Sequence, residues 1–225
     1  MLIHADFSLP AIVVPNDDDW QCSPESGVDR LMLDRIGDEV ARATSIVRYA
    51  KGSAFPRHMH AKGEEFLVLS GVFSDENGDY PTGCYVRNPP GSGHSPFSTN
   101  GCRILVKLRQ FDAADLTTVV IKTRDSKDWQ KNDDGSAEFL HLYEFGSEQV
   151  QMVRIAAGQK FSMNTSPAGA EALVVSGSVK YAGELFPLES WLRFPAEYAA
   201  ELLVVTDTLL WMKSGHLPDE TINDL

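Results

Sequence analysis

The sequence predicts an all-β protein built from two tandem modules. Short stretches of alternating apolar and polar residues are separated by turns rich in glycine, proline, asparagine and aspartate. That alternation is typical of strands joined by hairpins. The second half of the chain also repeats the first half without a gap, which indicates an internal duplication.

The expected strands of the first half follow one another closely. Residues 1–20 resemble an extended arm that could add a strand to a neighbouring module or subunit. Gly37 and Asp38 form a turn between two alternating stretches, and Asn77-Gly78 suits a type I′ hairpin turn. Residues 111–135 are polar, although 116–121 could form a bridging strand. The other expected strands are 30–36, 42–50, 55–60, 65–73, 84–88 and 102–110.

The repeat has an offset of 106 residues. Between residues 47–89 and 153–195, fourteen of forty-three positions are identical, several times the number expected by chance. Asp-Trp-Gln also recurs at 19–21 and 128–130, with a slightly different offset. We place the boundary between the modules after residue 111, so that 1–111 is an arm plus a first module and 112–225 is a linker plus a second.

Four possible metal ligands occur in the first module. His58, His60 and Glu64 lie at even positions of one stretch, so the two histidines point the same way from an extended chain. A loop fixed by Pro89, Pro90, Gly91 and Gly93 presents His94 from farther along the chain. Three imidazoles and one carboxylate make a ligand set for a first-row transition metal.

The same four positions lose their ligands together in the repeat, where they hold Asn164, Ser166, Ala170 and Ala200. Their joint loss is expected if they act as one unit. By contrast, Glu65 is retained as Glu171 in the module without ligands. We therefore expect Glu64 to bind the metal and Glu65 to be structural. The ligands alone do not choose among iron, manganese, nickel, copper and zinc. We expect one divalent transition metal, zinc or iron in the first place, with manganese and nickel as alternatives.

The glycines and prolines around these residues identify a family resemblance. Gly52, His58, His60, Glu64 and Gly71 match the first cupin motif in order and spacing, and Gly83, Pro89, Gly91 and His94 match the second. Ser98 departs from the pattern, which often has asparagine there, but that position is not a ligand. The resemblance implies two double-stranded β-helix, or jelly-roll, modules, the first with a metal in its mouth and the second degenerate.

A narrower resemblance covers residues 20–111. This region is similar to the cupin domain of ChrR-type anti-ECF-sigma factors, a domain type that includes small dioxygenases cleaving diketones and hydroxyketones. In those anti-sigma factors a separate zinc-binding helical domain grips the sigma factor. About twenty residues precede the first module here, without an HxxxCxxC segment. We therefore expect no sigma-factor binding by the helical mode.

Several other residues carry weaker expectations. Arg87 recurs as Arg193, which suggests a shared structural ion pair; the alternative is a substrate carboxylate site near the mouth. Possible pocket walls of the first module are Phe66, Phe73, Tyr85 and Phe97. The second cavity could be closed by Trp191, Phe194 and Tyr198, or it could hold an apolar ligand. His4, His141 and His216 have no ligand-spaced partner and are expected at the surface or in the core.

Composition excludes some classes of function. The net charge is −12 and no basic run occurs, which argues against nucleic-acid binding. No apolar stretch is long enough to span a membrane, and the first residues do not resemble a signal peptide. Cys22, Cys84 and Cys102 form no CxxC pair and are expected to be reduced thiols. We expect a cytoplasmic protein that binds a small molecule and could form a homodimer.

Three functions are compatible with this sequence. The resemblance slightly favours a metal-dependent sensor or regulator of the ChrR cupin type. The first alternative is an iron-dependent dioxygenase that cleaves a small diketone or hydroxyketone. The second is a metal-stabilised structural or binding protein that performs no chemistry. The catalytic residues, if any, are not indicated by the sequence.

Overall fold

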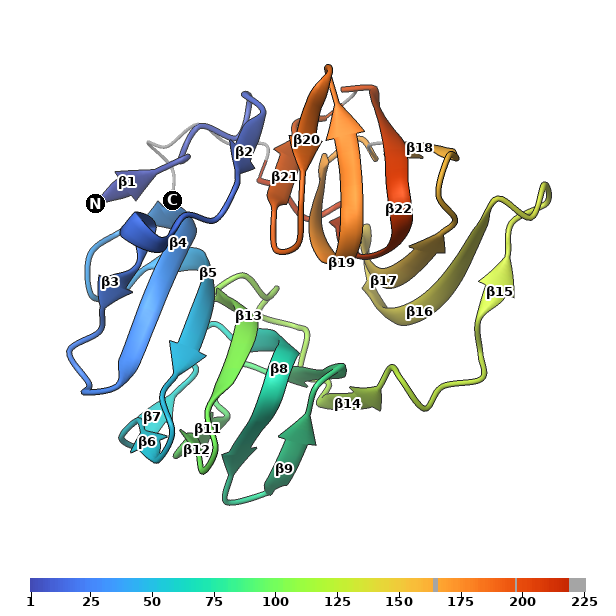
Figure 1. The fold of residues 1–225 in the computed structure, drawn as a ribbon. Coiled ribbons are helices and arrows are strands. Elements are labelled where there is room, and N and C mark those ends of the chain that lie inside the picture. The colour runs from blue at the N-terminus through green and yellow to red at the C-terminus, as the bar shows by residue number, and fades with distance from the viewer. Residues whose placement is uncertain (164–165, 197, 219–225) are drawn as a thin grey trace. The chain divides into compact units, whose positions relative to one another are not determined.

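The computed structural model describes residues 1–163, 166–196 and 198–218, and almost all of its regular structure is β (Figure 1). The chain forms two compact units. The first contains residues 1–5 and 16–125, and the second contains 6–15 and 126–218 of the described chain. None of the described helices is long and apolar enough to cross a membrane.

The first unit is an antiparallel sheet in the order β1-β4-β5-β13-β8-β10-β14, with a separate two-stranded ladder, β7-β11. Its elements are β1 (Leu2–Ile3), the short 3-10 helix η1 (Asp17–Asp19), β3 (Gln21–Cys22), β4 (Val28–Ile36), β5 (Arg42–Tyr49), β6 (Ser53–Ala54), β7 (His58–Met59), β8 (Glu64–Asp75), β9 (Gly78–Pro81), β10 (Cys84–Asn88), β11 (Gly93–His94), β12 (Phe97–Ser98), β13 (Cys102–Leu108) and β14 (Val119–Lys122).

The second unit repeats this arrangement in the order β15-β16-β17-β22-β19-β21-β2. Its strands are β2 (Ala11–Val13), β15 (Gln130–Lys131), β16 (Ala137–Phe145), β17 (Glu148–Ile155), β18 (Lys160–Met163), β19 (Ala170–Tyr181), β20 (Glu184–Phe186), β21 (Trp191–Phe194) and β22 (Ala200–Ser214). The expected all-β fold with two repeated modules is confirmed.

Two edge strands come from the N-terminal arm and from the linker between the modules. The arm contributes β2, which pairs with β21 so that Ala11 lies opposite Arg193. The linker contributes β14, which pairs with β10 so that Val119 lies opposite Arg87. The extra strand expected in the arm is therefore confirmed. The strand expected at 116–121 lies at Val119–Lys122 and adds to the edge of the first unit. Each strand shields an edge that would otherwise expose unpaired backbone groups.

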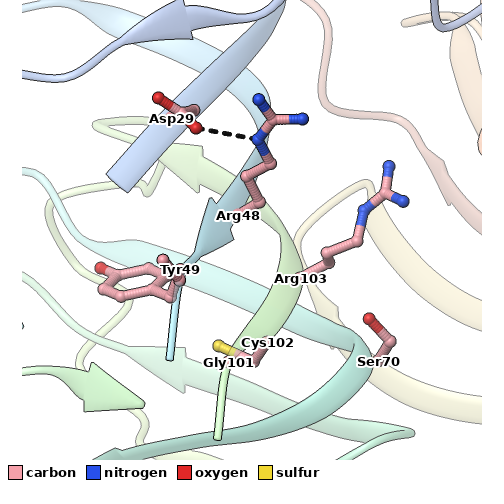
Figure 2. Close-up of a pocket in the computed structure, with 8 residues that line it drawn as sticks. Asp29, Arg48, Tyr49, Ser70, Gly101, Cys102 and Arg103 are labelled. Atoms are coloured by element: carbon pink, nitrogen blue, oxygen red, sulfur yellow. Dashed lines mark hydrogen bonds and ion pairs between the residues drawn. The ribbon is translucent and has the colours of Figure 1, made fainter. Parts of the chain in front are cut away.

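The repeated Asp-Trp-Gln also has a structural explanation. The Arg48 guanidinium lies 4.4 Å from the centre of the Trp20 ring, and Arg154 lies 3.6 Å from that of Trp129. Arg48 and Arg154 are equivalent in the repeat. Figure 2 shows Arg48 paired with Asp29, while the Tyr49 ring points away from them, as strand alternation requires. The tryptophan therefore covers the outer face of the sheet in each module.

One expected turn is wrong. Asp75 pairs with Gly78, so the two-residue loop is Glu76-Asn77 and not Asn77-Gly78. A type I′ turn needs positive φ at both loop residues, and neither Glu76 nor Asn77 has it. Instead, the Asn77 backbone N–H donates to the Asp75 carboxylate at 2.7 Å and shapes the loop.

Arg87 is the centre of a buried ion cluster. Its side chain is 1% exposed, and its amino groups lie 2.8 Å from Glu65 and 2.6 Å from Asp115. The Tyr85 hydroxyl also donates to Glu65 at 2.7 Å. The expected structural ion pair is confirmed for Arg87. The alternative role in binding a substrate carboxylate is wrong, because Arg87 is buried and occupied.

Candidate metal centre

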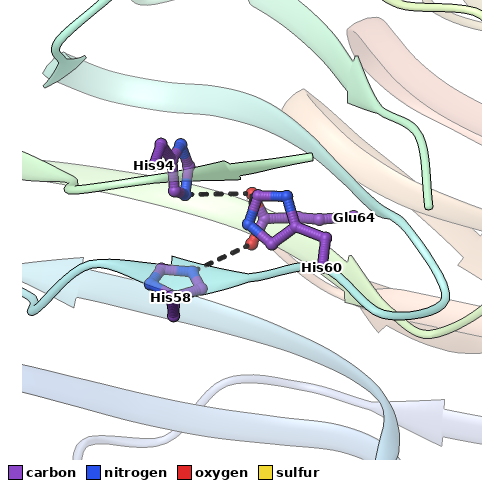
Figure 3. A group of neighbouring side chains, drawn as sticks. All are labelled: His58, His60, Glu64 and His94. Carbon is purple, nitrogen blue, oxygen red and sulfur yellow. Dashed lines mark ion pairs between the residues drawn. The ribbon is translucent and has the colours of Figure 1, made fainter. Parts of the chain in front are cut away.

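The backbone brings the four expected ligands of the first module together. β7 pairs with β11 so that His58 lies directly opposite His94. His60 follows β7, and Glu64 begins β8 after a turn in which Gly63 has a φ of 76°. That φ favours glycine, and a Cβ there would also lie 2.3 Å from the Phe111 ring. The turn therefore directs Glu64 back toward the histidines (Figure 3).

The loop that carries His94 is tied to His60. The His60 backbone N–H donates to the Ser92 carbonyl at 2.8 Å, and the Gly91 N–H donates to the His60 carbonyl at 2.9 Å. These bonds hold the two motifs in one register. Their effect is to fix the relative positions of side chains that lie more than thirty residues apart in the sequence.

The ligand atoms are close enough for one ion. The Glu64 carboxylate lies 4.0 Å from Nε2 of His58, 3.6 Å from that of His60 and 3.4 Å from that of His94. All four ligand atoms lie within 4.8 Å of one another. Zinc and similar metals bind nitrogen and oxygen at about 2.0–2.2 Å, so ligands around one ion are separated by roughly 3–4 Å. The cluster could therefore hold a metal ion.

The second ring nitrogen of each histidine has a partner of its own. Nδ1 of His58 lies 3.0 Å from the Pro56 carbonyl, and Nδ1 of His94 lies 3.0 Å from the Asp75 carboxylate. Nδ1 of His60 lies 3.0 Å from the Ser92 hydroxyl, whose proton is donated to the Pro89 carbonyl. Each partner must accept, so each Nδ1 carries the proton and leaves the Nε2 lone pair for a metal.

The surroundings of two of these Nε2 atoms indicate that a metal would fit the cluster. Nε2 of His60 and Nε2 of His94 are buried and have no hydrogen-bond partner among the described residues. A buried polar atom without a partner costs free energy. A metal ion would provide the missing partner for both atoms, and the neutral imidazoles are the form that binds metals.

Electrostatics keep the carboxylate ionised. Burial alone would raise the pKa of Glu64, but a hydrogen bond from His58 and the charges of the three imidazoles lower it to about 2. The contact with Glu64 raises the pKa of His58, whereas burial lowers the pKa of His60. Glu64 thus stays ionised, and when the three imidazoles are neutral the cluster carries one negative charge, which complements a divalent cation.

Glu64 and Glu65 point to different places, as expected from strand alternation. Glu64 faces the histidines, whereas Glu65 belongs to the buried cluster around Arg87. The structure therefore separates the two carboxylates into different environments. The assignment of Glu64 as the ligand stays a prediction until a metal is measured.

A cavity of about 400 Å³ adjoins the cluster. Its lining includes all four candidate ligands, and its apolar wall comes largely from β4, β5 and β13. Of the aromatic residues expected as walls, only Phe73 lines the cavity. Phe66 packs behind it, Tyr85 bonds to Glu65, and Phe97 lies on the surface. The walls that sequence reasoning missed are Val28, Val47, Tyr49, Phe55, Ile104 and Val106.

The corresponding region of the second module is filled. Ala170 and Ala200, which replace Glu64 and His94, are buried in its core. Phe194 packs there and stacks on Tyr198 with ring centres 5.2 Å apart, as expected. Trp191 does not help to close this region, because its indole N–H donates to Glu171 at 2.8 Å in a different cluster. Asn164, the counterpart of His58, lies outside the described residues.

The remaining histidines and cysteines form no second centre in the described chain. The side chain of His216 is 2% exposed, and its Nε2 lies 2.8 Å from Glu171. Nδ1 of His4 lies 2.7 Å from the Leu33 carbonyl. His141 is exposed. All three cysteines are free thiols, and burial raises the pKa of both Cys84 and Cys102 to about 11. Burial therefore disfavours the reactive thiolate form of these two cysteines.

The jelly-roll repeats and the His/Glu cluster define a two-module cupin. The model of the ChrR Cupin-like domain matches the chain twice, over residues 9–112 and 117–218. The chain therefore belongs to the family of ChrR Cupin-like proteins. Among curated proteins, none matches the sequence.

Solved structures share the fold at low sequence identity. A bacterial pirin from Escherichia coli in complex with nickel(II) is 14% identical, with 92% of this chain and 99% of that chain covered and a TM-score of 0.67. The salicylate 1,2-dioxygenase of Pseudaminobacter salicylatoxidans is 11% identical, with 93% and 85% covered and a TM-score of 0.63. A cupin 2 barrel protein of Leptotrichia buccalis is 11% identical, with 95% and 99% covered and a TM-score of 0.59.

Proposed function

We propose that the first module binds one divalent transition metal through His58, His60, Glu64 and His94, and that the protein is a dioxygenase acting on a small diketone or hydroxyketone. The observation that carries this proposal is the cavity beside the cluster. A purely structural metal site is normally closed by its ligands, whereas a catalytic site leaves room for water or substrate.

The residues of the cavity have separable tasks in this proposal. Glu64 and the three imidazoles carry one negative charge, so a bound divalent ion would keep a net positive charge toward the ligand. The Nδ1 partners hold the histidines in one tautomer. The apolar wall excludes water and orients the carbon skeleton. A bound iron ion would bind the ketone oxygens and dioxygen.

A metal-dependent sensor or regulator is the second candidate, and the family model favours it. The same cavity would bind the signal molecule, and occupancy would change the protein's affinity for a partner. The helical mode of sigma-factor binding is not part of this proposal. Both candidate functions require the metal and a small-molecule ligand. They differ in whether the protein converts that ligand into a product.

Metal content and oxygen consumption test the proposal together. The chain is purified without a metal-affinity column, its metals are measured by plasma mass spectrometry, and oxygen uptake is followed with a diketone panel that includes acetylacetone. Iron with uptake supports the dioxygenase. Tightly bound zinc without uptake supports the sensor. The absence of metal after reconstitution would overturn both.

A further inference from the structure

Three arginines line the cavity beside the candidate metal centre. They are Arg30 on β4, Arg35 near the end of β4, and Arg109 just after β13. The whole chain carries an excess of twelve negative charges, so cations gathered at one cavity are unexpected. Glu39, which is exposed, also lines this cavity.

These arginines differ from their neighbours in having no carboxylate partner. Within the described chain, none of the three lies within 4.0 Å of an acidic side chain. Other arginines of the unit do have such partners: Arg48 pairs with Asp29 at 2.8 Å and Arg42 with Asp34 at 3.8 Å. The cavity therefore holds guanidinium groups that are not paired with a carboxylate, although the side chains of Glu39 and Glu64 also line it.

Arg30 and Arg109 have donors available for a ligand. One amino group of Arg30 donates to the Ser23 hydroxyl at 3.0 Å, and no other partner is found for its side chain among the described residues. Arg35 is more constrained, because its guanidinium donates to the carbonyls of Gly37 and Asp38. Burial, followed by the charge of nearby Arg30, lowers the pKa of Arg35, which indicates that the two cations lie close together.

The repeat shows that these cations accompany the metal ligands. Arg30 lies opposite Val47, and its counterpart opposite Val153 is Phe139. The backbone N–H of Arg109 donates to the Gly63 carbonyl at 2.9 Å, and that of Gly215 donates to the Gly169 carbonyl at 2.9 Å. Arg109 is therefore replaced by Gly215. Both cations are absent from the module that has lost its ligands.

Two arginines with structural roles are retained in the repeat. Arg48, stacked on Trp20, is retained as Arg154, and Arg87 of the buried ion cluster is retained as Arg193. Other arginines of the first module are also lost in the repeat; Arg103, for example, is replaced by Leu209. The losses of Arg30 and Arg109 bear on the site because both residues line the cavity.

Arg109 also occupies a backbone position that disfavours it. Its φ is 61°, in the left-handed region, and its counterpart Gly215 has a φ of 74°. Glycine adopts that conformation without strain, whereas a side chain raises its free energy. An arginine kept at a strained position beside a cavity points to a role in the function of the site.

We propose that the cavity selects a small organic anion, with Arg30 and Arg109 binding its carboxylate while its other oxygen atoms reach the metal centre. Guanidinium groups suit this task because their planar donors match both oxygens of a carboxylate. Tyr49 lies along the cavity wall within the electrostatic influence of both Glu64 and Arg30. The proposal rests on the proposed function and narrows its substrate class to ketones that carry a carboxylate.

A matched pair of ligands tests this specificity. Acetylacetone and acetylpyruvate share a β-dicarbonyl group and differ at one end, where a methyl group is replaced by a carboxylate. Calorimetric titration of the metal-loaded protein should show about tenfold or greater preference for acetylpyruvate, which corresponds to about 1.4 kcal/mol or more. Equal affinities for the two ligands would overturn the proposal.

Three variants assign the preference to the arginines. Arg30→Met and Arg109→Gly should each remove most of it without weakening acetylacetone binding, whereas Arg48→Met should leave both affinities unchanged. Arg109→Gly places in the first module the residue found in the second, so it should fold well. A preference that persists in both cavity variants would come from chelation alone and would contradict the proposal.

Failure of this inference can be told from failure of the proposed function. If the protein takes up metal and binds both ligands equally in every variant, the metal site stands and the anion site does not. If no metal is taken up, the proposed function fails. Acetylpyruvate titrated into the metal-free protein then still tests Arg30 and Arg109 directly, and the absence of arginine-dependent binding there would overturn the anion site as well.

Discussion

The choice between Glu64 and Glu65 shows what single residues contribute. The sequence argument used only alternation and the repeat, and the structure places the two carboxylates on different faces of β8 with different partners. One faces three imidazoles, and the other lies in a buried ion cluster. Replacing each glutamate by glutamine should therefore affect different properties: metal binding at Glu64 and folding stability at Glu65.

We expect Glu64→Gln to weaken metal binding by more than the roughly 10- to 100-fold loss caused by removing an outer-sphere partner. Glu65→Gln should retain the metal but lower the free energy of unfolding by about 3 kcal/mol or more, because it breaks a buried ion pair. Metal affinity and thermal unfolding of both variants check this. Equal losses of metal would show that the wrong carboxylate was assigned.

Asp75 is a residue that sequence reasoning missed. It accepts from Nδ1 of His94 at 3.0 Å and from the Tyr80 hydroxyl at 3.2 Å, and it shapes the β8–β9 loop. A signal was present, since the repeat replaces Asp75 by Tyr181 and His94 by Ala200. The outer-sphere partner was lost together with its ligand, but without coordinates it could not be separated from ordinary turn residues.

We expect Asp75→Asn to lower metal affinity by about 10- to 100-fold, because an amide holds the His94 tautomer less firmly than a carboxylate does. Asp79→Asn is the matched control. Asp79 lies in the same hairpin and accepts from the Ser74 hydroxyl at 2.6 Å, with no contact to the histidines among its described bonds. Competition with a metal indicator measures both variants, and an unchanged affinity for Asp75→Asn would exclude the positioning role.

At the scale of elements, strands could be predicted better than turns. The hairpin of β4 and β5 lies where alternation and Gly37-Asp38 placed it. The β8–β9 turn was misplaced by one residue because Asp75 controls it through its side chain. In the second module, Ala182 and Gly183 both have positive φ in the equivalent loop, so the type I′ geometry occurs there instead.

The glycine of β8 recurs in β19, and the structure gives the reason for it. Gly71 has a φ of 74°, and a Cβ there would lie 2.1 Å from the Gly101 carbonyl. Gly177 shows the same approach, 2.3 Å from the Asp207 carbonyl. The glycine therefore allows two backbones to cross closely in each module.

We expect Gly71→Ala to destabilise the protein clearly more than Gly52→Ala. Gly52 has a φ of 76° with open space around its missing Cβ, so its substitution costs only the backbone strain, about 1 kcal/mol. At Gly71 the collision with the carbonyl adds to that strain. Denaturant unfolding of both variants measures the difference, and equal costs would show that the backbone relaxes freely around Gly71.

At the scale of the whole molecule, the cavity arginines could not be found from the sequence. Arg30, Arg35 and Arg109 are far from the motifs in sequence and reach the cavity only through the pairing of β4, β5 and β13. The metal ligands could be found because four residues and their spacing were concentrated in two short motifs. Cavity walls are distributed among strands, and a spacing rule does not capture them.

The duplication predicts how many metal ions each chain binds. Only the first of the two repeated clusters retains ligands, and in the second Ala170 and Ala200 are packed within the core together with Phe194. Alanine has no donor atom for a metal, and the packed aromatic ring leaves that position occupied. We therefore expect one metal ion per chain and not two.

Replacing His58 and His94 together by alanine should reduce this value to zero, because two ligands and the β7–β11 contact between them are lost. Ser166→Ala, at the second-module counterpart of His60, should leave the content at one metal ion per chain. Metal per chain after dialysis, with circular dichroism to verify folding, measures both variants. Stoichiometric metal in the double variant would place the ion elsewhere, and a loss of metal on Ser166→Ala would mean that the second module takes part in binding.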